Sequence, residues 1–462
     1  MTEHIRKVLR DSKAARWTAL LIVSFTMFAG YYLADAMAPL QEMLEKQLHW
    51  DSTEYGFFTS AYGWFNVFLF FLIIGGIILD KKGIRFTGTG AAAVMVSGTA
   101  LKYWAISTHS LDGAIIFGWK AQVMMAAIGY AIFGVGVEIA GVTVSKIIVK
   151  WFKGHEMAFA MGLQVSIARI GTGLAISTAL PVSQVFGNVS VPVLFGLVLL
   201  CIGLIAFIIY NISDKKLDVS LHESTMADET YVAEEEFKTS DIFSILKNKG
   251  WWYIAILCVL FYSAVFPFLK YATNLMTNKF GVADDWAGLI PGLLPFGTIL
   301  FTPLFGSIYD KKGRGATIMI IGSLIILGVH LLFAVPFINE SYMAFILMII
   351  LGIGFSLVPS AMWPSVPKII PDRQLGTAYS LIFWVQNWGL MGVPLLIGWV
   401  LDKWCITGTK ITADGSSVTT YNYQIPMLIF AGFGVLALIF AFLLKAEDKK
   451  MGYGLEKPNI ED

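Results

Sequence analysis

The chain has 462 residues, of which 56% are hydrophobic and 14% charged, with mean hydropathy +0.70 and net charge +1. Soluble domains carry about 25% charged residues, so the composition excludes an ordinary soluble fold and indicates an all-α membrane protein. The near-zero net charge predicts no nucleic-acid partner. Cys201, Cys258 and Cys405 lie far apart, which predicts neither a disulfide framework nor a metal site.

Twelve apolar segments follow one another along the chain, each about as long as the 20 residues that cross a bilayer. The first follows a basic N-terminal stretch and lacks a clean cleavage site, so we expect a retained helix and not a signal peptide. The expected spans are 17–38, 55–79, 86–107, 122–146, 155–180, 190–212, 251–273, 286–309, 315–337, 342–367, 374–401 and 423–445.

A charged stretch over 213–250, which contains Glu234, Glu235 and Glu236, separates the first six spans from the last six. We expect a solvated cytoplasmic linker there, with a binding tail as the alternative. The sequence therefore predicts two six-helix bundles, 1–212 and 251–462. Lysine and arginine concentrate in the loops on the side of the N-terminus, so both termini are expected in the cytoplasm.

Two loops at equivalent places in the halves share a pattern of glycine, aspartate, glycine and arginine. The shared positions are Gly76, Asp80, Gly83 and Arg85 after span 2, and Gly306, Asp310, Gly313 and Arg314 after span 8. The glycines allow close helix contact and a tight turn, and the aspartate can pair with a basic group or a helix N-terminus. We interpret the loops as latches that break when the halves rock. The pattern resembles the signature loop of the major facilitator superfamily, which implies two pseudo-symmetric six-helix bundles and alternating access.

Four ionisable residues lie within spans, where charges are costly and usually face a cavity or a partner: Asp35, Glu138, Arg169 and Lys270. Glu138 and Arg169 lie near the middle of spans 4 and 5. They are either a structural ion pair or a site facing a cavity, and the cost of about 2.5–3.5 kcal/mol per midplane charge favours a site. Arginine holds a carboxylate bidentately and glutamate accepts from an ammonium, so the pair predicts a zwitterionic solute, an amino acid or a short peptide.

Asp35, near the end of span 1, is a candidate gate residue, with an interfacial acid or a proton carrier as alternatives. Aromatic and amide side chains along the expected path are further candidates for substrate contact. They are Tyr32, Trp64, Asn66, Tyr262, Phe266, Trp363, Gln386 and Asn387. Aromatic walls suit varied solute side chains, whereas the amides either bind substrate or bond across helices.

The sequence contains no phosphate-binding loop, no His-Glu-x-x-His and no Gly-x-Ser-x-Gly. We therefore expect neither an enzyme nor a cofactor.

Several stretches resemble the family of the lysosomal dipeptide uniporter called major facilitator superfamily domain-containing protein 1, with its prokaryotic relatives. They are Asn66, the Gly76–Arg85 loop, Trp151–Gly154, Gly162–Gly171, Ala264–Phe268, Met362–Pro364, Gln374–Tyr379 and Gln386–Asn387. The resemblance implies transport of dipeptides with little side-chain preference, the N-terminus held at Glu138 and the C-terminus at Arg169. It also implies a monomer.

The chain departs from that family at Tyr130, where the family carries an arginine, and its N-terminus shows no obvious acidic dileucine sorting signal. We therefore expect a prokaryotic inner membrane, without an accessory subunit.

Two other hypotheses for the function stay open. One is a proton-linked transporter of sugar acids or other small organic anions, in which Arg169 and Lys270 bind the carboxylate and Glu138 or Asp35 carries the proton. The other is a non-transporting receptor on the same fold.

Overall fold

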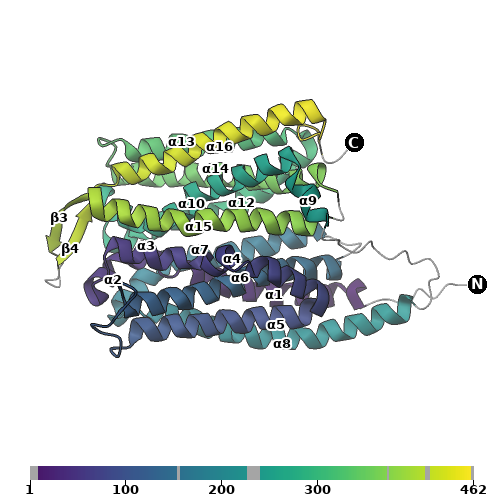
Figure 1. Cartoon of the computed structure of the whole chain (residues 1–462), viewed down its shortest axis with the longest axis horizontal. Coiled ribbons are helices and arrows are strands. Elements are labelled where there is room, and N and C mark those ends of the chain that lie inside the picture. The colour runs from purple at the N-terminus through teal and green to yellow at the C-terminus, as the bar shows by residue number, and fades with distance from the viewer. Residues whose placement is uncertain (1–8, 153–156, 226–239, 372–373, 412–416, 459–462) are drawn as a thin grey trace, which may run out of the picture.

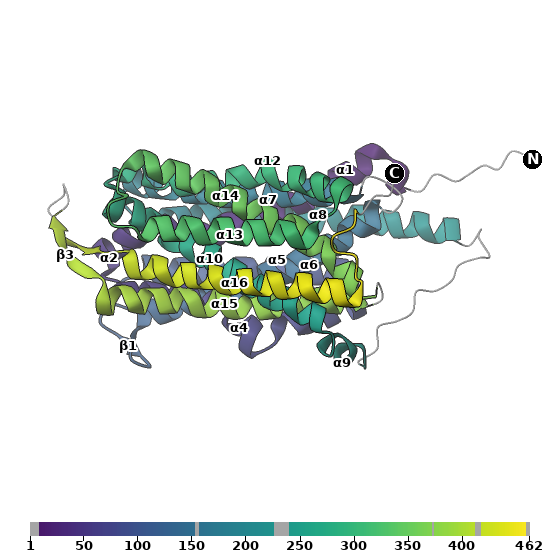
Figure 2. The same cartoon turned by 90° about the horizontal axis from the view of Figure 1, so that it is seen from above.

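The computed structural model describes residues 9–152, 157–225, 240–371, 374–411 and 417–458. Long helices lie side by side in two bundles, the N-terminal one below and the C-terminal one above in Figure 1. Helix α1 begins and helix α16 ends at one end of the molecule, which we call the terminal end (Figures 1 and 2). The antiparallel hairpin β3–β4 marks the opposite end, which we call the hairpin end.

Short 3-10 turns and short helices join the long helices of the N-terminal bundle. Its elements are η1 Leu9–Asp11, α1 Lys13–Asp35, η2 Ala38–Leu40, α2 Gln41–Leu48, α3 Ser52–Ser60, η3 Ala61–Gly63, α4 Trp64–Phe68, α5 Phe71–Ser107, β1 Ile115–Ile116, β2 Trp119–Lys120, α6 Ala121–Phe152, α7 Met157–Phe186 and α8 Val191–Thr225.

The C-terminal bundle follows the same plan. Its elements are α9 Ser240–Leu246, α10 Lys249–Phe280, α11 Asp284–Ala287, α12 Leu289–Lys312, α13 Gly315–Ala334, α14 Ser341–Ile369, α15 Leu375–Trp404, β3 Ile406–Ile411, β4 Ser417–Tyr421 and α16 Gln424–Met451. The segment 213–250 begins inside α8, which continues to Thr225, and it contains α9. Its acidic run at 234–236 lies outside the described residues.

Among the described residues, ten helices are long and apolar enough to cross a membrane, and the bent pair Ser52–Phe68 and Phe71–Leu79 supplies an eleventh. The remaining predicted span, 86–107, is the part of α5 that follows Gly83, where a φ of 79° interrupts the helix. An exposed apolar stripe on α8, formed by Val198, Ile202, Ile205 and Ile209, fits a helix face against lipid.

The second span is broken between α4 and α5. The two parts meet at 56°, and Phe70 at the break has a positive φ of 55°. Such a break frees backbone groups that must find other partners inside a membrane. Trp384 of α15 supplies one, since its indole N–H donates to the Val67 carbonyl at 3.1 Å.

The predicted latch loops have the expected turns and different partners. In the first, Arg85 bonds to Asp214 at 3.2 Å and to Asp218 at 2.6 Å, both on α8. The side chain of Asp80 lies outside the described residues. In the second, Gly313 has a φ of 68°, and Arg314 donates its backbone N–H to the Glu456 carbonyl at 3.0 Å.

The first glycine of each latch is not at a tight helix crossing in this state. A Cβ built on Gly306 would meet no described atom within 4 Å, and one on Gly76 would lie 4.0 Å from the Ser380 hydroxyl. The close helix contact expected at these glycines is therefore not formed here. Both glycines lie away from the hairpin end, where the halves cross closely.

Asp214 is the buried centre of the first latch. Its side chain is fully buried and accepts from Lys150 at 2.8 Å, Tyr210 at 3.0 Å and Arg85. We expect Asp214→Asn to lower the free energy of unfolding by about 3 kcal/mol, because it strips a buried ion-pair network of its anion. Thermal unfolding of the purified protein measures this. Asp218→Asn is the control, since Asp218 is 42% exposed and its loss should cost less than about 1 kcal/mol; equal effects would contradict the prediction.

The two halves meet closely at the hairpin end. A Cβ built on Gly56 of α3 would lie 2.7 Å from the Pro394 carbonyl oxygen of α15. A Cβ built on Gly398 would lie 2.3 Å from the Ser52 carbonyl oxygen. The Asp402 carboxylate of α15 accepts from the Ser52 backbone N–H, at the start of α3. Backbones that approach this closely leave no passage, so the hairpin end is closed.

A larger side chain at this crossing should keep the hairpin end open. We expect Gly398→Ala to raise the labelling rate of a Ser52→Cys reporter by an impermeant maleimide, because Ser52 is only 1% exposed in the closed state. Gly392→Ala on the same helix is the control, since its Cβ meets nothing described within 4 Å. The same labelling rate in both variants would show that this crossing does not control closure.

Candidate functional site

Arg169 of α7 lies between the halves, with aromatic rings on three sides. Its guanidinium carbon is 5.3 Å from the ring centroid of Tyr31 on α1, 5.0 Å from Phe266 on α10 and 5.6 Å from Phe355 on α14. In the described part of the chain the guanidinium forms no hydrogen bond and no ion pair. Its N–H donors are therefore free to bind a ligand, while cation–π contacts with the three rings stabilise the guanidinium.

Glu138 of α6 is the second charge of the site. The Tyr62 hydroxyl donates to its carboxylate at 2.7 Å, and the Asn387 amide of α15 interacts with it from the other half. Glu138 forms no ion pair with Arg169 among the described residues. Tyr31, whose ring centroid lies 5.3 Å from the Arg169 guanidinium carbon, is within electrostatic range of the Glu138 carboxylate as well.

Three of the predicted aromatic residues form a wall in the C-terminal half. The rings of Tyr262 and Phe266 stack with centroids 5.2 Å apart, and the Trp363 indole donates to the Tyr262 hydroxyl at 3.3 Å. Phe355 packs edge-on against both Tyr262 and Phe266. Since Phe266 also covers Arg169, this wall continues to the guanidinium.

The two amides of α15 lie beside this wall and are mostly buried. The Gln386 carbonyl oxygen accepts from the Cys258 thiol at 3.6 Å. Asn387 donates to the Phe383 carbonyl at 2.9 Å, and its side-chain oxygen has no hydrogen-bond partner in the described structure. Asn387 is thus the amide that the structure brings to Glu138.

Tyr32, Trp64 and Asn66 form no hydrogen bond or ion pair with Glu138 or Arg169 in the described structure, and their contacts lie within the N-terminal bundle. Tyr32 packs edge-on against Phe195 of α8, with centroids 5.4 Å apart. The Trp64 indole donates to the Ser60 hydroxyl at 3.1 Å. The Asn66 amide, fully buried, donates to the Gly134 carbonyl at 3.2 Å and joins α4 to α6.

The structure adds Phe355 to the neighbourhood of the charges, beside Tyr31 and Tyr62, two further aromatic residues of the expected path. Tyr31 directly precedes Tyr32, and a step of one residue turns a helix by about 100°, which moves the ring to another face. Phe355 precedes Trp363 by eight positions, a spacing that keeps two residues on one helix face. That spacing in the sequence could have identified Phe355.

Asp35 and Lys270 form an ion pair across the halves at the closed hairpin end. The Lys270 ammonium lies 2.7 Å from the Asp35 carboxylate and 2.7 Å from the Ala34 carbonyl oxygen. The Tyr55 hydroxyl of α3 donates to the Lys270 carbonyl at 2.9 Å. The gate role expected for Asp35 stays a prediction. In this structure the Lys270 ammonium is engaged by the Asp35 carboxylate.

Comparison with known proteins finds relatives over most of the chain. The lysosomal dipeptide transporter MFSD1 of Bos taurus is 28% identical over 412 residues, covering 84% of this chain and 80% of the relative. The Danio rerio protein of that name is 29% identical over 407 residues, covering 84% and 81%. The D-galactonate transporter of Escherichia coli O6:H1 is 22% identical over 409 residues, covering 83% and 89%.

Solved structures of transporters share the fold at low identity. The nucleoside transporter NupG aligns with a TM-score of 0.62 and 16% identity, over 92% of this chain and 98% of that one. The D-xylose-proton symporter aligns with a TM-score of 0.66 and 15% identity, over 92% and 97%. The sequence profile described as Major Facilitator Superfamily matches residues 20–394 and 276–458. The fold prediction is confirmed, and the chain belongs to the major facilitator superfamily of membrane transporters.

Proposed function

We propose that this protein is an alternating-access transporter of small zwitterionic solutes, in particular dipeptides, and that it catalyses no covalent reaction. The observation that carries the proposal is the Arg169 guanidinium, ringed by aromatic side chains of both halves and without an acidic partner in the described structure. Glu138, close to the same region, supplies the opposite charge.

A dipeptide matches these groups end to end. Its carboxylate fits the planar fork of Arg169, and its ammonium fits the Glu138 carboxylate. The wall of Tyr262, Phe266 and Trp363 offers apolar surface to varied side chains without demanding one of them. Because Arg169 and the wall belong to different halves, a bound solute would favour their approach, and this couples binding to the rocking motion.

The names of the relatives support this substrate class, since MFSD1 is described as a dipeptide transporter. We further propose that the terminal end faces the cytoplasm and the hairpin end faces outward, in a prokaryotic inner membrane. The protein would work as a monomer without an accessory subunit. The latch loops around Gly83 and Gly313 would open and reform at the cytoplasmic side during each cycle.

Transport of small organic anions is the second candidate function. It is favoured by the similarity to the D-galactonate transporter and by the Arg169 guanidinium, which has no ion-pair partner among the residues that the structure describes. Lys270, which that hypothesis uses as a second cation, is engaged by Asp35 at 2.7 Å. This engagement weighs against the anion hypothesis, as does the acidic Glu138 near the same region.

Solute counterflow in proteoliposomes tests the proposal. Vesicles containing the purified protein are loaded with unlabelled alanyl-alanine and placed in labelled alanyl-alanine, with empty vesicles as the control. We expect accumulation of label that excess unlabelled dipeptide abolishes and D-galactonate does not. Accumulation of galactonate without dipeptide would establish the second candidate, and no accumulation of either solute would support the receptor hypothesis.

A further inference from the structure

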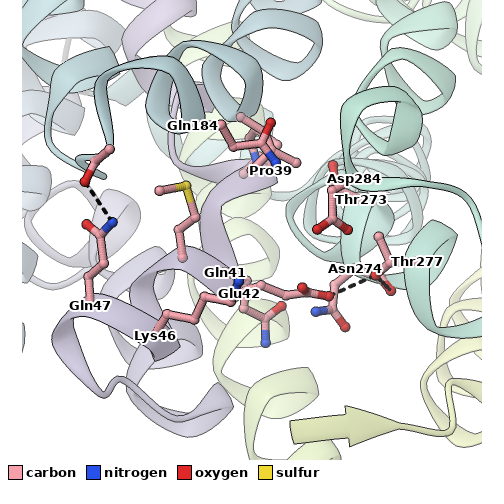
Figure 3. A pocket seen from close by; sticks show the side chains of 14 residues that line it. Pro39, Gln41, Glu42, Lys46, Gln47, Gln184, Thr273, Asn274, Thr277 and Asp284 are labelled. Atoms are coloured by element: carbon pink, nitrogen blue, oxygen red, sulfur yellow. Dashed lines mark hydrogen bonds between the residues drawn. The ribbon is translucent and has the colours of Figure 1, made fainter. Parts of the chain in front are cut away.

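A polar pocket lies between the halves at the hairpin end, outside the region of Glu138 and Arg169. It has a volume of about 390 Å³, within the range of small-molecule sites. Figure 3 shows Gln41 and Glu42 of α2 on one side and Thr273 and Thr277 of α10, with Asp284, on the other. Both halves therefore contribute its walls.

The pocket lies directly outside the gate pair. Ala38 and Pro39, which line it, follow Asp35 by three and four positions on the N-terminal half. Thr273 follows Lys270 by three positions on α10, which is about one helical turn toward the hairpin end. A solute passing the gate on the outer side would meet this pocket.

Unsatisfied acceptors lie in its walls. Gln41 and Thr273 are each 4% exposed, and the side-chain oxygen of each is buried without a hydrogen-bond partner in the described structure. The Asp284 carboxylate, which also lines the pocket, forms no hydrogen bond or ion pair with the described residues. Buried oxygens without donors are costly, so this arrangement is suited to a ligand rich in N–H donors.

The hydrogen bonds that join the two walls of the pocket form only while the two halves are in contact at the hairpin end. The Glu42 carboxylate accepts from Thr277 of α10 at 3.0 Å and from Lys410 of β3 at 2.9 Å, both on the other half. Separation of the halves at the hairpin end would break these bonds and move Asp284 and Thr273 away from Gln41. A ligand held by both walls therefore binds one conformer only, and it must shift the population toward that conformer.

We propose that this pocket is a second binding site, for the ammonium group of a small amine or peptide on the outer side, and that its occupancy holds the hairpin end closed. The ammonium donates to the Asp284 carboxylate and to the orphaned oxygens of Gln41 and Thr273. An amine or peptide bound in this pocket therefore slows separation of the Asp35–Lys270 pair, which the same molecule would have to pass to enter the protein. The inference rests on the alternating access proposed above and not on the solute transported.

Glycinamide tests the inference, because it carries an ammonium but no carboxylate for Arg169. The readout is the rate at which an impermeant maleimide labels a Ser52→Cys reporter. The background is Glu138→Gln, which removes the acid that the proposed transport site offers to an ammonium. We expect glycinamide to slow labelling and N-acetylglycinamide to have no effect. Asp284→Asn and the isosteric Thr273→Val should each raise the glycinamide concentration required for protection, Asp284→Asn by about tenfold or more.

Glu340→Gln is the matched control, since Glu340 is an exposed acid before α14, outside the pocket lining. It should leave the protection unchanged. Protection that disappears in the Glu138→Gln background, survives Asp284→Asn, or is reproduced by sodium chloride alone would overturn the proposal. Failure of dipeptide counterflow with the protection intact would instead overturn only the assignment of the transported solute.

Discussion

Arg169→Lys should lower dipeptide uptake at subsaturating concentration by about tenfold or more, although the positive charge is kept. The planar fork of arginine places two N–H groups on one carboxylate and stacks on flat rings, whereas an ammonium is a compact point charge. The rings of Tyr31, Phe266 and Phe355 surround the guanidinium at 5.0–5.6 Å and favour the planar ion. Arg169→Ala should abolish uptake. Initial rates in proteoliposomes measure both.

A matched pair of variants separates the site from general damage. Glu138→Gln should weaken uptake of free dipeptides, because a neutral amide replaces the anion that meets the ammonium. Trp64→Phe should leave uptake nearly unchanged, since the Trp64 indole bonds to the Ser60 hydroxyl and to neither charge in the described structure. Normal dipeptide uptake by both Glu138→Gln and Arg169→Ala would contradict the assignment of the site.

Lys270→Met should shift the protein toward the state that is open at the hairpin end and reduce turnover at least tenfold. The substitution leaves Asp35, which is only 8% exposed, without its cation, and breaking a buried pair costs about 3–5 kcal/mol. The pair joins α1 to α10, so that cost falls on the closed state alone. Faster labelling of the Ser52→Cys reporter by an impermeant maleimide would show the shift.

The exchange Asp35→Lys with Lys270→Asp tests whether the pair itself matters. The double variant should recover part of the closure that Lys270→Met loses, because it restores an ion pair at the same crossing. A Lys270→Met protein with unchanged labelling and unchanged turnover would show that the pair does not control the gate.

The sequence predicted the architecture well because the hydropathic and repeat signals are local. Runs of apolar residues and the recurring loops at Gly83 and Gly313 identify the spans and the duplication without any tertiary contact. The break of the second span at Phe70 could not be predicted in this way. No proline or glycine occupies that position, and Trp384 of the other half supplies a hydrogen bond there.

The two charges within the spans could be identified from the sequence, but their partners could not. A costly charge in a span is visible in the sequence, as Glu138 and Arg169 show. Whether they pair depends on how two helices rotate, and in the structure Glu138 bonds to Tyr62 instead. Tyr31 and Tyr32 illustrate the same limit. They are adjacent in the sequence, but the Tyr31 ring packs against Arg169 and the Tyr32 ring against Phe195.

Asp35 and Lys270 are 235 positions apart in the sequence, so only the packing of the two bundles reveals the pair. The same holds for the pocket of Gln41 and Thr273, whose walls come from different halves. Interactions within one helix face are predictable from spacing. Contacts between the two halves depend on how the bundles pack against each other, which the spacing of residues in the sequence does not give.

Thermal stabilisation by dipeptides with free and blocked ends tests the central claim most directly. A ligand that binds only the folded protein raises its stability by RT ln(1 + [L]/Kd). The account predicts stabilisation by free alanyl-alanine and its loss when either the N-terminus is acetylated or the C-terminus amidated. Equal stabilisation by the free and blocked peptides, or stabilisation by simple carboxylates alone, would contradict a site in which Glu138 and Arg169 hold the two ends of a dipeptide.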